Sequence, residues 1–356
     1  MGGAPHPLQQ WLIEGTDGRR CDITVGRGIA GHEALVPANR SRIAVLAQPP
    51  LAGLAQGIAA AMRQAGAVDA ELRVLPDGDE AKELAIVGET YRWLNEIGFT
   101  RDGLIVAIGG GALTDLAGFV AATYLRGVEV VYLPTTLLGA VDAAIGGKTG
   151  INVDGKNLAG VFRHPSRIVI DLNLLDALPE KLLREGAAET VKAGFIADEQ
   201  IVAAYEGDGI DAALDDVVPA AIDVKVTTVR EDFRESGRRA ILNYGHTIGH
   251  AVEIAAGIPH GEAVAIGMVA AGRVSAEVLG FRGSSRQRAV LERIGLPTTA
   301  PAVNADRVMD LIERDKKRDR SGLRMVLLRD FGEPVVQHVS PGSVDLGLRE
   351  IGIVPS

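Results

Sequence analysis

The segment "GLIVAIGGGALTDLAGF", residues 103–119, contains the pattern that decides the fold. It begins as an apolar run of strand length and passes through Gly109, Gly110 and Gly111 into a stretch with helical spacing. Glycines at such a turn let the backbone approach a phosphate, and the following helix begins with N–H groups that attract anions. The run does not match the G-x-G-x-x-G fingerprint. Alone it therefore predicts either a dinucleotide pyrophosphate site or a tight turn without a ligand.

The residues on both sides repeat this alternation of strand and helix. Alternating β and α elements predict a mostly parallel sheet with helices on both faces. A hairpin-like segment is expected just upstream, around "GIAGHEAL" at 28–35. Buried strands are predicted at 42–48, 71–76, 103–110, 129–136 and 167–172, and helices ending at glycine at 51–66 and 81–98.

The second half of the chain has a different, mainly helical pattern. Only 323–330 and 334–339 have strand character there, and they predict a small hairpin. We therefore expect an α/β N-terminal nucleotide-binding domain with a mostly parallel sheet at 1–175, followed by a mainly α-helical C-terminal domain at 176–356. Helices in the second domain are predicted at 178–207, 217–233, 238–253 and 261–280.

Composition excludes several classes of protein. The net charge of −9 argues against a general nucleic-acid binder. A single cysteine, Cys21, rules out a disulfide framework within one chain and fits a reducing compartment. No apolar stretch reaches the 18 or so residues of a membrane span, and the first residues lack the pattern of a signal peptide. We expect a cytoplasmic protein with neither nucleic acid nor membrane as a partner.

An acidic turn follows the predicted strand at 71–76. In "PDGDEAK", residues 76–82, Asp79 is suited to accept a hydrogen bond from a ribose hydroxyl, and Lys82 to meet a phosphate. A solvated turn has the same composition, so this signal is weak by itself.

A glycine-rich apolar segment, residues 141–160, carries an unexpected set of polar residues. Lysines in a segment with little surface character predict binding of an anionic ligand, whereas a solvated loop is the plainer reading. Arg126, at the end of the preceding helix, would add positive charge nearby. The segment holds Asp142, Lys148, Asn152, Lys156 and Asn157.

The stretch "RRAILNYGHTIGHAVE", residues 238–253, places His246 and His250 four apart on one helix face. Zinc proteases use such a pair, but no glutamate stands between these histidines to act as a base. With His260 and Glu189, one glutamate and two histidines would form a zinc site with an open position. Spacing alone does not choose which two histidines bind. Ordinary surface histidines are the alternative.

Taken together, these motifs resemble the 3-dehydroquinate synthase family and its sugar phosphate cyclase relatives, most of all the actinobacterial members. The resemblance extends from about residue 42 to about residue 330. It rests on "GGGALTDLAGFVAATYLRG", "LPTTLLGAVDAAIGGKTGIN", "GKNLAG", "AAETVKAG", "LNYGHTIGHAVE", "HGEAVAIGM" and "DKKRDRSGLRMVLL".

The resemblance implies a role for each of these residues. It assigns the metal, zinc or cobalt, to Glu189, His246 and His260, and it turns His250 toward the substrate. It implies that 1–175 binds NAD and that 176–356 binds metal and substrate. The implied NAD side comprises Asp79, Lys82, Gly109, Gly110, Gly111, Asp115, Thr135, Thr136, Lys148 and Lys156. The implied catalytic set comprises Asp142, Lys148, Asn157, Lys192, Lys225, Arg239, Asn243, His250, Lys316 or Lys317, and Arg126, the last reaching in from a neighbouring subunit of a homodimer.

The implied reaction is the NAD- and metal-dependent cyclisation of a small anionic sugar phosphate, 3-deoxy-D-arabino-heptulosonate 7-phosphate, to 3-dehydroquinate with loss of phosphate. A sister cyclase of secondary metabolism is the first alternative, and an aminodehydroquinate synthase fits these residues better than a sedoheptulose 7-phosphate cyclase. A metal-dependent polyol dehydrogenase is an alternative of another class, and it would accumulate NADH.

Three positions depart from the pattern of the family. Gln48 stands where many relatives have an acidic residue for the adenosine ribose, and Asp79 stands where glutamate is usual. His164, in "FRHP", replaces a glutamine before proline. The last change is consistent with either a paralogue of secondary metabolism or neutral drift.

Overall fold

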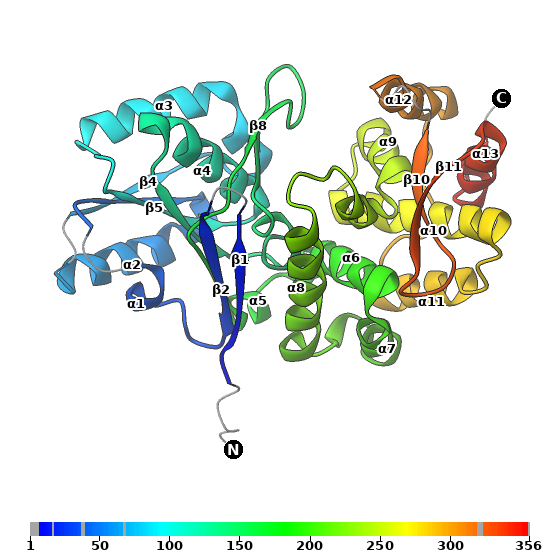
Figure 1. The fold of residues 1–356 in the computed structure, drawn as a ribbon, viewed down its shortest axis with the longest axis horizontal. Helices are drawn as coiled ribbons and strands as arrows, with labels where there is room; N and C mark the ends of the chain where they lie inside the picture. Colours follow the sequence, from blue (N-terminus) through cyan, green and yellow to red (C-terminus); the bar gives the residue numbers. More distant parts are fainter. Residues whose placement is uncertain (1–6, 16–17, 37–39, 67–68, 319–322, 355–356) are drawn as a thin grey trace. The chain divides into compact units, whose positions relative to one another are not determined.

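The computed structural model describes residues 7–15, 18–36, 40–66, 69–318 and 323–354, without the side chains of 32 and 314–318. The chain divides into two compact units, Met1–Leu178 and Pro179–Ser356 (Figure 1). Among the described residues, no helix combines the length and the apolar character needed to cross a membrane.

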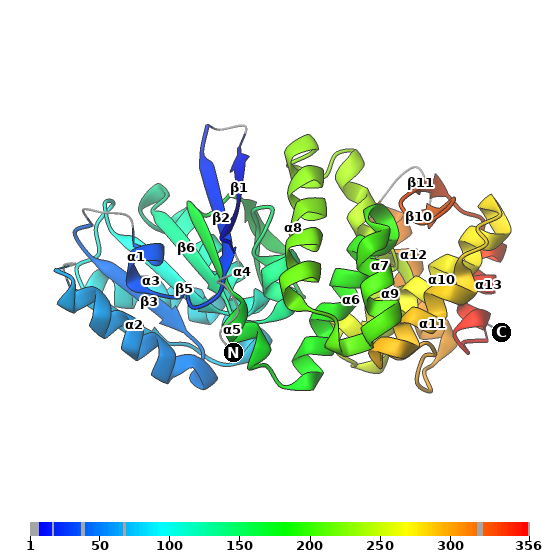
Figure 2. The ribbon, with the colours of Figure 1, turned by 90° about the horizontal axis from the view of Figure 1, so that it is seen from below.

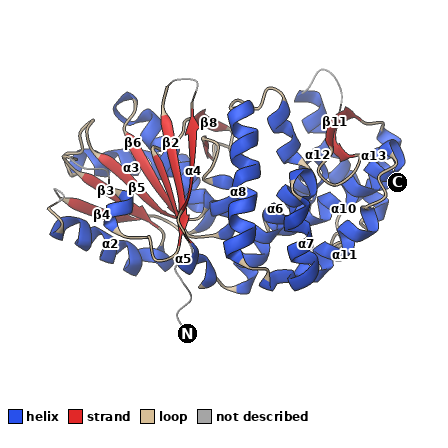
Figure 3. Ribbon diagram, turned by 60° about the horizontal axis from the view of Figure 1, so that its bottom comes forward, coloured by secondary structure: helices blue, strands red, loops and turns tan. Residues whose placement is uncertain are grey.

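The first unit is built on a seven-stranded sheet with the order β1-β2-β9-β6-β5-β3-β4 (Figure 3). Only β1 and β2 pair antiparallel, so the predicted, mostly parallel sheet is confirmed. The five predicted strands are all present. The strands are β1 Gln9–Glu14, β2 Arg20–Gly26, β3 Ile43–Ala47, β4 Ala70–Val74, β5 Leu104–Gly109, β6 Glu129–Pro134 and β9 Arg167–Asp171.

Helices cover both faces of this sheet. Every residue of β3 and β5 is buried, which explains why these strands are continuous apolar runs without alternation. One core cluster joins the sheet to Leu35 of α1 and to Met62 of α2. Figure 1 shows α3 and α4 on the opposite face. The helices are α1 His32–Leu35, α2 Ala52–Gln64, α3 Leu84–Glu96, α4 Gly111–Thr123 and α5 Leu172–Asp176, with short turns η1 Pro49–Leu51, η2 Gly78–Lys82 and η3 Tyr124–Arg126.

The hairpin expected at 28–35 is wrong. That segment holds the short helix α1, and the hairpin lies upstream, between β1 and β2. The backbone N–H groups of Gly28 and Ala30 each donate to the carboxylate of Asp171, at 2.9 Å in both cases. These groups are therefore bound by a side chain at the end of β9 and are not available to a partner strand.

The glycine-rich segment after β6 contains regular structure that the sequence did not predict. It begins with a π-helical turn, η4 Gly139–Ala143. It continues as an antiparallel hairpin of β7 Lys148–Ile151 and β8 Ala159–Phe162. The side chain of Thr149 exchanges hydrogen bonds with the backbone of Val161, at 2.8 and 3.3 Å, and so fastens the hairpin.

The second unit is mainly helical, as predicted. Its strands β10 and β11 form the expected antiparallel hairpin (Figure 2). The elements are α6 Glu180–Ala197, α7 Glu199–Asp208, η5 Gly209–Asp211, α8 Leu214–Glu231, η6 Arg238–Asn243, α9 His246–Ala256, α10 His260–Leu279, α11 Ser284–Ile294, α12 Ala305–Arg318, β10 Arg324–Leu328, β11 Pro334–His338 and α13 Pro341–Glu350.

The single helix expected over 238–253 is broken in two. The first part is the 3₁₀ turn η6, and α9 begins only at His246. Gly245 separates them in a left-handed conformation with φ of 80°, which an L side chain rarely adopts. The break places His246 at the first position of α9 instead of in the middle of a longer helix.

Candidate functional site

The glycine turn of the first unit is pressed against the segment that follows β6. Helix α4 begins at Gly111, and Gly110 is its N-cap residue. A Cβ added at Gly110 would lie 3.1 Å from Cγ2 of Thr136, and one added at Gly111 would lie 2.9 Å from Cβ of Ala143. The N–H of Thr135 donates to the carbonyl of Gly109 at 3.0 Å. Close packing thus accounts for the glycines and brings both threonines beside the helix N-terminus.

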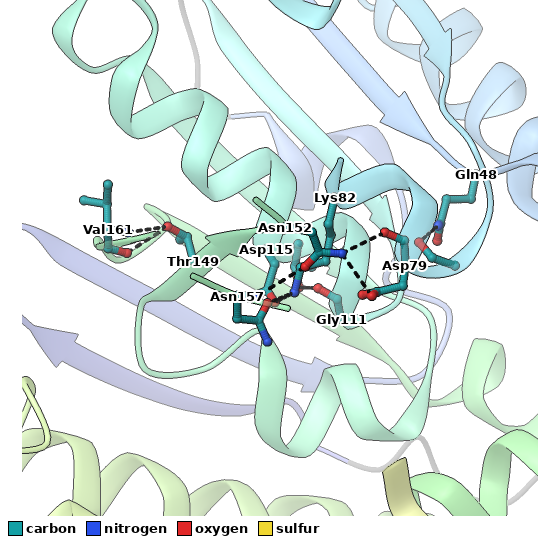
Figure 4. Close-up of polar contacts among 11 residues, drawn as sticks. Gln48, Asp79, Lys82, Gly111, Asp115, Thr149, Asn152, Asn157 and Val161 are labelled. Carbon is teal, nitrogen blue, oxygen red and sulfur yellow. Dashed lines mark hydrogen bonds and ion pairs between the residues drawn. The ribbon is translucent and has the colours of Figure 1, made fainter. Parts of the chain in front are cut away.

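Three of the predicted residues on this side contact one another through Lys82 (Figure 4). The Nζ of Lys82 lies 2.6 Å from Oδ2 of Asp115 and also donates to Oδ1 of Asn157. Lys82 is only 4% exposed, so its charge requires these partners. Burial raises the pKa of Asp115 to about 6, although the adjacent Lys82 ammonium acts in the opposite direction.

Asn152 connects this cluster to Asp79. Its side-chain amide donates to Oδ2 of Asp79 at 3.0 Å, and its Oδ1 accepts from the N–H of Asn157 at 3.1 Å. Its own N–H donates to the carbonyl of Lys82 at 2.8 Å. No individual role was predicted for Asn152 from the sequence, where the only signal was a polar residue at the end of an apolar run. It holds three of the predicted residues in one arrangement.

Gln48 fixes the same turn from the end of β3. It is 6% exposed, and its Nε2 donates to the carbonyls of Pro76 and Gly78, at 3.2 Å each. An ionised acidic side chain could not donate either bond. The glutamine therefore has a structural reason of its own, which is to hold the turn that carries Asp79.

The remaining predicted residues of the first unit are more dispersed. Asp142 lies in η4, and its charge contributes to the raised pKa of Asp115. Lys148, at the start of β7, and Lys156 are exposed. Arg126 ends η3 with φ of 64° and forms no hydrogen bond or ion pair with another described residue. Buried His164 lies between β8 and β9, and nothing in the structure explains its presence there.

In the second unit, four predicted side chains converge from three helices. His246 and His250 belong to α9, His260 opens α10, and Glu189 lies in α6. The Oε1 of Glu189 lies 3.3 Å from Nε2 of His246 and 3.3 Å from Nε2 of His260. One nitrogen from each of the three histidines falls within 4.8 Å of the others.

Backbone packing, not long side chains, brings these helices together. A Cβ added at Gly267 of α10 would lie 2.0 Å from the carbonyl oxygen of Gly245, just before α9. One added at Gly261 would lie 2.5 Å from the carbonyl oxygen of Glu185 in α6. Both contacts exclude any larger residue and fix the starts of α9 and α10 against their neighbours.

Hydrogen bonds at Nδ1 orient two of the histidines. His246 Nδ1 lies 3.2 Å from the carbonyl oxygen of Tyr244, and His260 Nδ1 lies 3.0 Å from Oε2 of Glu253. A proton held at Nδ1 directs Nε2 toward a metal. The side chain of His250 makes no hydrogen bond to another described residue, and its ring packs edge-on against His246, with centroids 4.9 Å apart. Glu189, His246 and His260 stay the predicted ligand set, and the three histidines form a second possible group.

Electrostatics at this site centre on Glu189. Its Oε2 forms an ion pair with Nζ of Lys192, and the two side chains are 1% and 3% exposed. Burial alone would favour the protonated carboxyl, but the charges of Lys192 and His246 outweigh it and hold the pKa of Glu189 well below its usual range.

The other two histidines shift in opposite directions. Burial alone disfavours the imidazolium of His260, but hydrogen bonds to Glu189 and Glu253 outweigh it and raise its pKa to about 10. Desolvation of the ring, together with the nearby His246 and His260, lowers the pKa of His250 to about 3. Near neutral pH, these directions favour an imidazolium at His260 and a neutral ring at His250 in the protein without metal.

These residues fit a divalent metal such as zinc. One carboxylate and two imidazoles are a common ligand set for zinc that leaves a coordination position open. Glu189 is ionised, both Nε2 atoms point at its Oε1, and both Nδ1 atoms have acceptors. These side chains would hold the ion, which would have to displace the Nε2 proton of His260.

The predicted anion-binding residues of the second unit are largely buried. Lys225 of α8 is 7% exposed and Arg239 of η6 is 1% exposed. A guanidinium nitrogen of Arg239 donates to the carbonyl of Phe233 at 2.6 Å. The amide of Asn243 donates to Oε1 of Glu235 at 2.6 Å. The side chains of Lys316 and Lys317, in α12, lie outside the described residues.

The sequence interpretation overlooked Glu235 and Glu253. Glu253 follows His246 by seven residues, two turns along the same helix face, and this spacing was a usable signal. Glu235 has φ of 56° in the loop before η6, where no periodic pattern points to Asn243.

Comparisons with known proteins agree with the architecture described above. Residues 72–185 match the 3-dehydroquinate synthase N-terminal family, and residues 186–318 match the C-terminal family. The 3-dehydroquinate synthase of Rhodococcus opacus is 43% identical over 325 residues, which cover 88% of this chain and 87% of that protein.

Two solved structures of cyclases are also similar. A 2-deoxy-scyllo-inosose synthase complexed with carbaglucose-6-phosphate, NAD+ and Co2+ is 25% identical, with a TM-score of 0.87 over 97% of this chain and 99% of that one. The 2-epi-5-epi-valiolone synthase of Streptomyces hygroscopicus, with NAD+ and Zn2+ bound, is 27% identical, with a TM-score of 0.86 over 96% and 99% of the two chains. Sequence identity over most of the chain, in a fold shared with these cyclases, shows that the chain belongs to the 3-dehydroquinate synthase family.

Proposed function

We propose that this protein is a lyase that converts 3-deoxy-D-arabino-heptulosonate 7-phosphate to 3-dehydroquinate and phosphate, with NAD and a divalent metal, zinc or cobalt. The observation that carries the proposal is the convergence of Glu189, His246 and His260 in a chain 43% identical to 3-dehydroquinate synthases. The cofactors agree with those bound in the two similar cyclases, NAD+ with Co2+ or Zn2+.

The reaction is redox-neutral overall. A ring hydroxyl of the sugar acid phosphate is oxidised, the new ketone acidifies the neighbouring C–H, phosphate leaves, and the ketone is reduced again. The enol that remains opens and closes by an intramolecular aldol step into the carbocycle. When bound, NAD supplies the hydride acceptor and donor, and the metal supplies a Lewis acid that polarises the oxygen being oxidised.

The residues of the first unit are proposed to bind NAD. The N-terminus of α4 at Gly111 offers N–H groups and a positive dipole end to the pyrophosphate. Asp79, held by Asn152, is placed to accept from a ribose hydroxyl. Thr135, Thr136, Lys148 and Lys156 complete the proposed NAD set, and Asp115 with Lys82 anchors it.

The second unit is proposed to bind the metal and the anionic substrate. Lys192 lies beside the metal ligands through its ion pair with Glu189. His250 has a depressed pKa and a neutral ring, so near neutral pH it can exchange hydrogen bonds with a substrate hydroxyl without carrying a charge of its own. Lys225, Arg239, Asn243 and Lys316 or Lys317 complete the proposed substrate residues of this unit. Asp142, Lys148 and Asn157 are the substrate residues proposed in the first unit.

The test is phosphate release by the metal- and NAD-loaded enzyme from three substrates at equal concentration. The proposal predicts turnover of 3-deoxy-D-arabino-heptulosonate 7-phosphate without a lasting rise of absorbance from NADH. Faster release from the amino analogue would assign the protein to a sister cyclase. We propose that Arg239 binds the substrate carboxylate, because its planar guanidinium can bind both oxygens. Faster release from sedoheptulose 7-phosphate, which has no carboxylate, would contradict that role. Stoichiometric NADH would favour a polyol dehydrogenase.

A variant pair tests the metal set directly. His246→Ala should lose bound metal and turnover while keeping its circular dichroism spectrum, and His338→Ala, an exposed histidine of β11, should match the wild type. Full metal occupancy in His246→Ala would contradict the assignment.

We also propose that the protein is a cytoplasmic homodimer in which Arg126 completes the site of the neighbouring subunit. Its location at the end of η3, without a partner among the described residues, supports this proposal. Light scattering should give twice the chain mass. Mixing an Arg126→Ala chain with an inactive His246→Ala chain should restore part of the activity, which separate active sites within single chains would not allow.

A further inference from the structure

We propose that Glu253 is a positioning residue that orients His260 toward the metal and strengthens its binding. The proposal rests on the metal site proposed above and adds a residue outside its ligand set. Glu253 lies in α9 and His260 opens α10, so the contact crosses the turn between the two helices. It brings a carboxylate to Nδ1, on the edge of the imidazole ring opposite the Nε2 atom that faces Glu189.

The geometry of the contact is that of an oriented histidine ligand. Glu253 Oε2 lies 3.0 Å from Nδ1 of His260, while Nε2 of the same ring lies 3.3 Å from Oε1 of Glu189. The side chain of Glu253 is 14% exposed and that of His260 is 30% exposed, so the bond is partly shielded from water. The ring is held at both ends, and its Nε2 lies at the point where Nε2 of His246 also meets Glu189.

The two histidines differ in what holds Nδ1. His246 uses a neutral acceptor, the carbonyl of Tyr244, at 3.2 Å. His260 uses a carboxylate, which both fixes the tautomer and makes Nε2 a stronger donor to a cation. Glu253 also places a negative charge one ring away from the metal position. A divalent ion carries two positive charges, and Glu189 neutralises one of them. The carboxylate of Glu253 would compensate part of the other.

The alternative to a role in metal binding is that this contact only stabilises the turn between α9 and α10. The bond spans the turn of residues 257–259, and Gly257 ends α9 in the left-handed conformation with φ of 65°. If the contact only stabilises this turn, its removal would lower the stability of the metal-free protein. It would leave metal affinity unchanged once the protein has folded. Affinity and stability therefore separate the two functions.

The experiment measures zinc affinity by competition with a chromophoric chelator, using full-length protein stripped of metal. Four proteins are compared: wild type, Glu253→Ala, Glu253→Gln and Glu277→Ala. Glu277 lies in α10, is 52% exposed and pairs with Arg273 at 3.6 Å, so it is a matched acidic control away from the histidines. Thermal unfolding of each metal-free protein is recorded in parallel, together with the absorption bands of its cobalt complex.

We expect Glu253→Ala to weaken zinc binding 10- to 100-fold, the range typical when such an outer partner is lost. Glu253→Gln keeps an acceptor for Nδ1 and should recover part of the affinity, and Glu277→Ala should match the wild type. The cobalt bands of Glu253→Ala should shift because the imidazole is less constrained.

Three results would overturn the inference. One is zinc affinity of Glu253→Ala within twofold of wild type, even with a lowered unfolding temperature, because the contact would then be only a staple of the turn. Another is Glu253→Gln binding no better than Glu253→Ala, which would rule out the orienting hydrogen bond. If wild type itself binds no zinc, the proposed metal site fails, and this outcome is distinct because all four proteins then behave alike.

Discussion

Replacing Lys192 by methionine is expected to destabilise the protein without metal and to increase the stabilisation that metal provides. Lys192 and Glu189 form an ion pair in which the side chains are 3% and 1% exposed. Methionine preserves much of the volume of the lysine stem but cannot neutralise the carboxylate. The substitution therefore leaves a buried charge with one compensating cation fewer.

The magnitude follows from this burial. Removing one partner of a buried pair typically costs about 3–5 kcal/mol. His260, with its pKa raised to about 10, still offers an imidazolium to the other oxygen of Glu189, so the low end, about 3 kcal/mol, applies. For a folding unit of this size, each kcal/mol of lost stability lowers the midpoint of thermal unfolding by about 2–4 °C. The variant should therefore unfold about 6–12 °C below wild type.

Zinc should reverse most of this loss. A divalent cation replaces the charge of Lys192, and in the variant it no longer competes with an ammonium group for the same carboxylate. The assay is thermal unfolding of both proteins with chelator and with saturating zinc. Lys181→Met, an exposed lysine of the same helix, is the control. Two results would refute the reasoning. One is a metal-free Lys192→Met variant whose unfolding temperature equals that of Lys181→Met. The other is an equal rise of the unfolding temperature of wild type and variant when zinc is added.

Three further predictions concern protons and a thiol. Because the folded chain holds the proton of Asp115 more tightly than the unfolded chain, this residue stabilises the fold most below about pH 4 and the effect is lost by about pH 6. In guanidinium titrations, the unfolding free energy of wild type minus that of Asp115→Asn should rise on acidification through this window, and a fall would contradict the raised pKa. Zinc binding at pH 7 should release a proton from His260, so the calorimetric heat should vary with the ionisation enthalpy of the buffer; identical heats would argue against an imidazolium there. Burial raises the pKa of the Cys21 thiol, so a disulfide reagent should modify it only after unfolding, and rapid reaction of the native chain would contradict its burial.

The sequence predicted elements well wherever a local pattern was continuous. The apolar run before Gly109 became β5, and the helical spacing after it became α4, because strand and helix periodicities are set within a few residues. The expected helix over 238–253 was wrong at one point. Whether Gly245 interrupts a helix depends on its contact with Gly267, which is far along the chain and invisible to a local pattern.

The same limit applies to the candidate site. Residue types suited to a ligand were recognised one by one, for example Asp79 and Lys82 on an acidic turn. The residues that hold them were not recognised, because an asparagine such as Asn152 has no chemistry that singles it out. Its importance comes from bonding Asp79, 73 positions away, and this pairing exists only in the folded chain. Contacts of this kind require the fold before they can be inferred.

The close backbone contacts at Gly245 and Gly261 have a consequence for selectivity among metals. They hold the starts of α9 and α10, where His246 and His260 lie, against neighbouring main chain. Copper(II) binds nitrogen and oxygen donors more tightly than its neighbours in the first transition series, but it prefers a square-planar arrangement. The proposed ligand set of Glu189, His246 and His260 would be held by these main-chain contacts and would resist flattening to suit copper. Ions that tolerate a tetrahedral arrangement, such as zinc and cobalt, would require no such change, so two glycines that touch no metal would contribute to discrimination against copper.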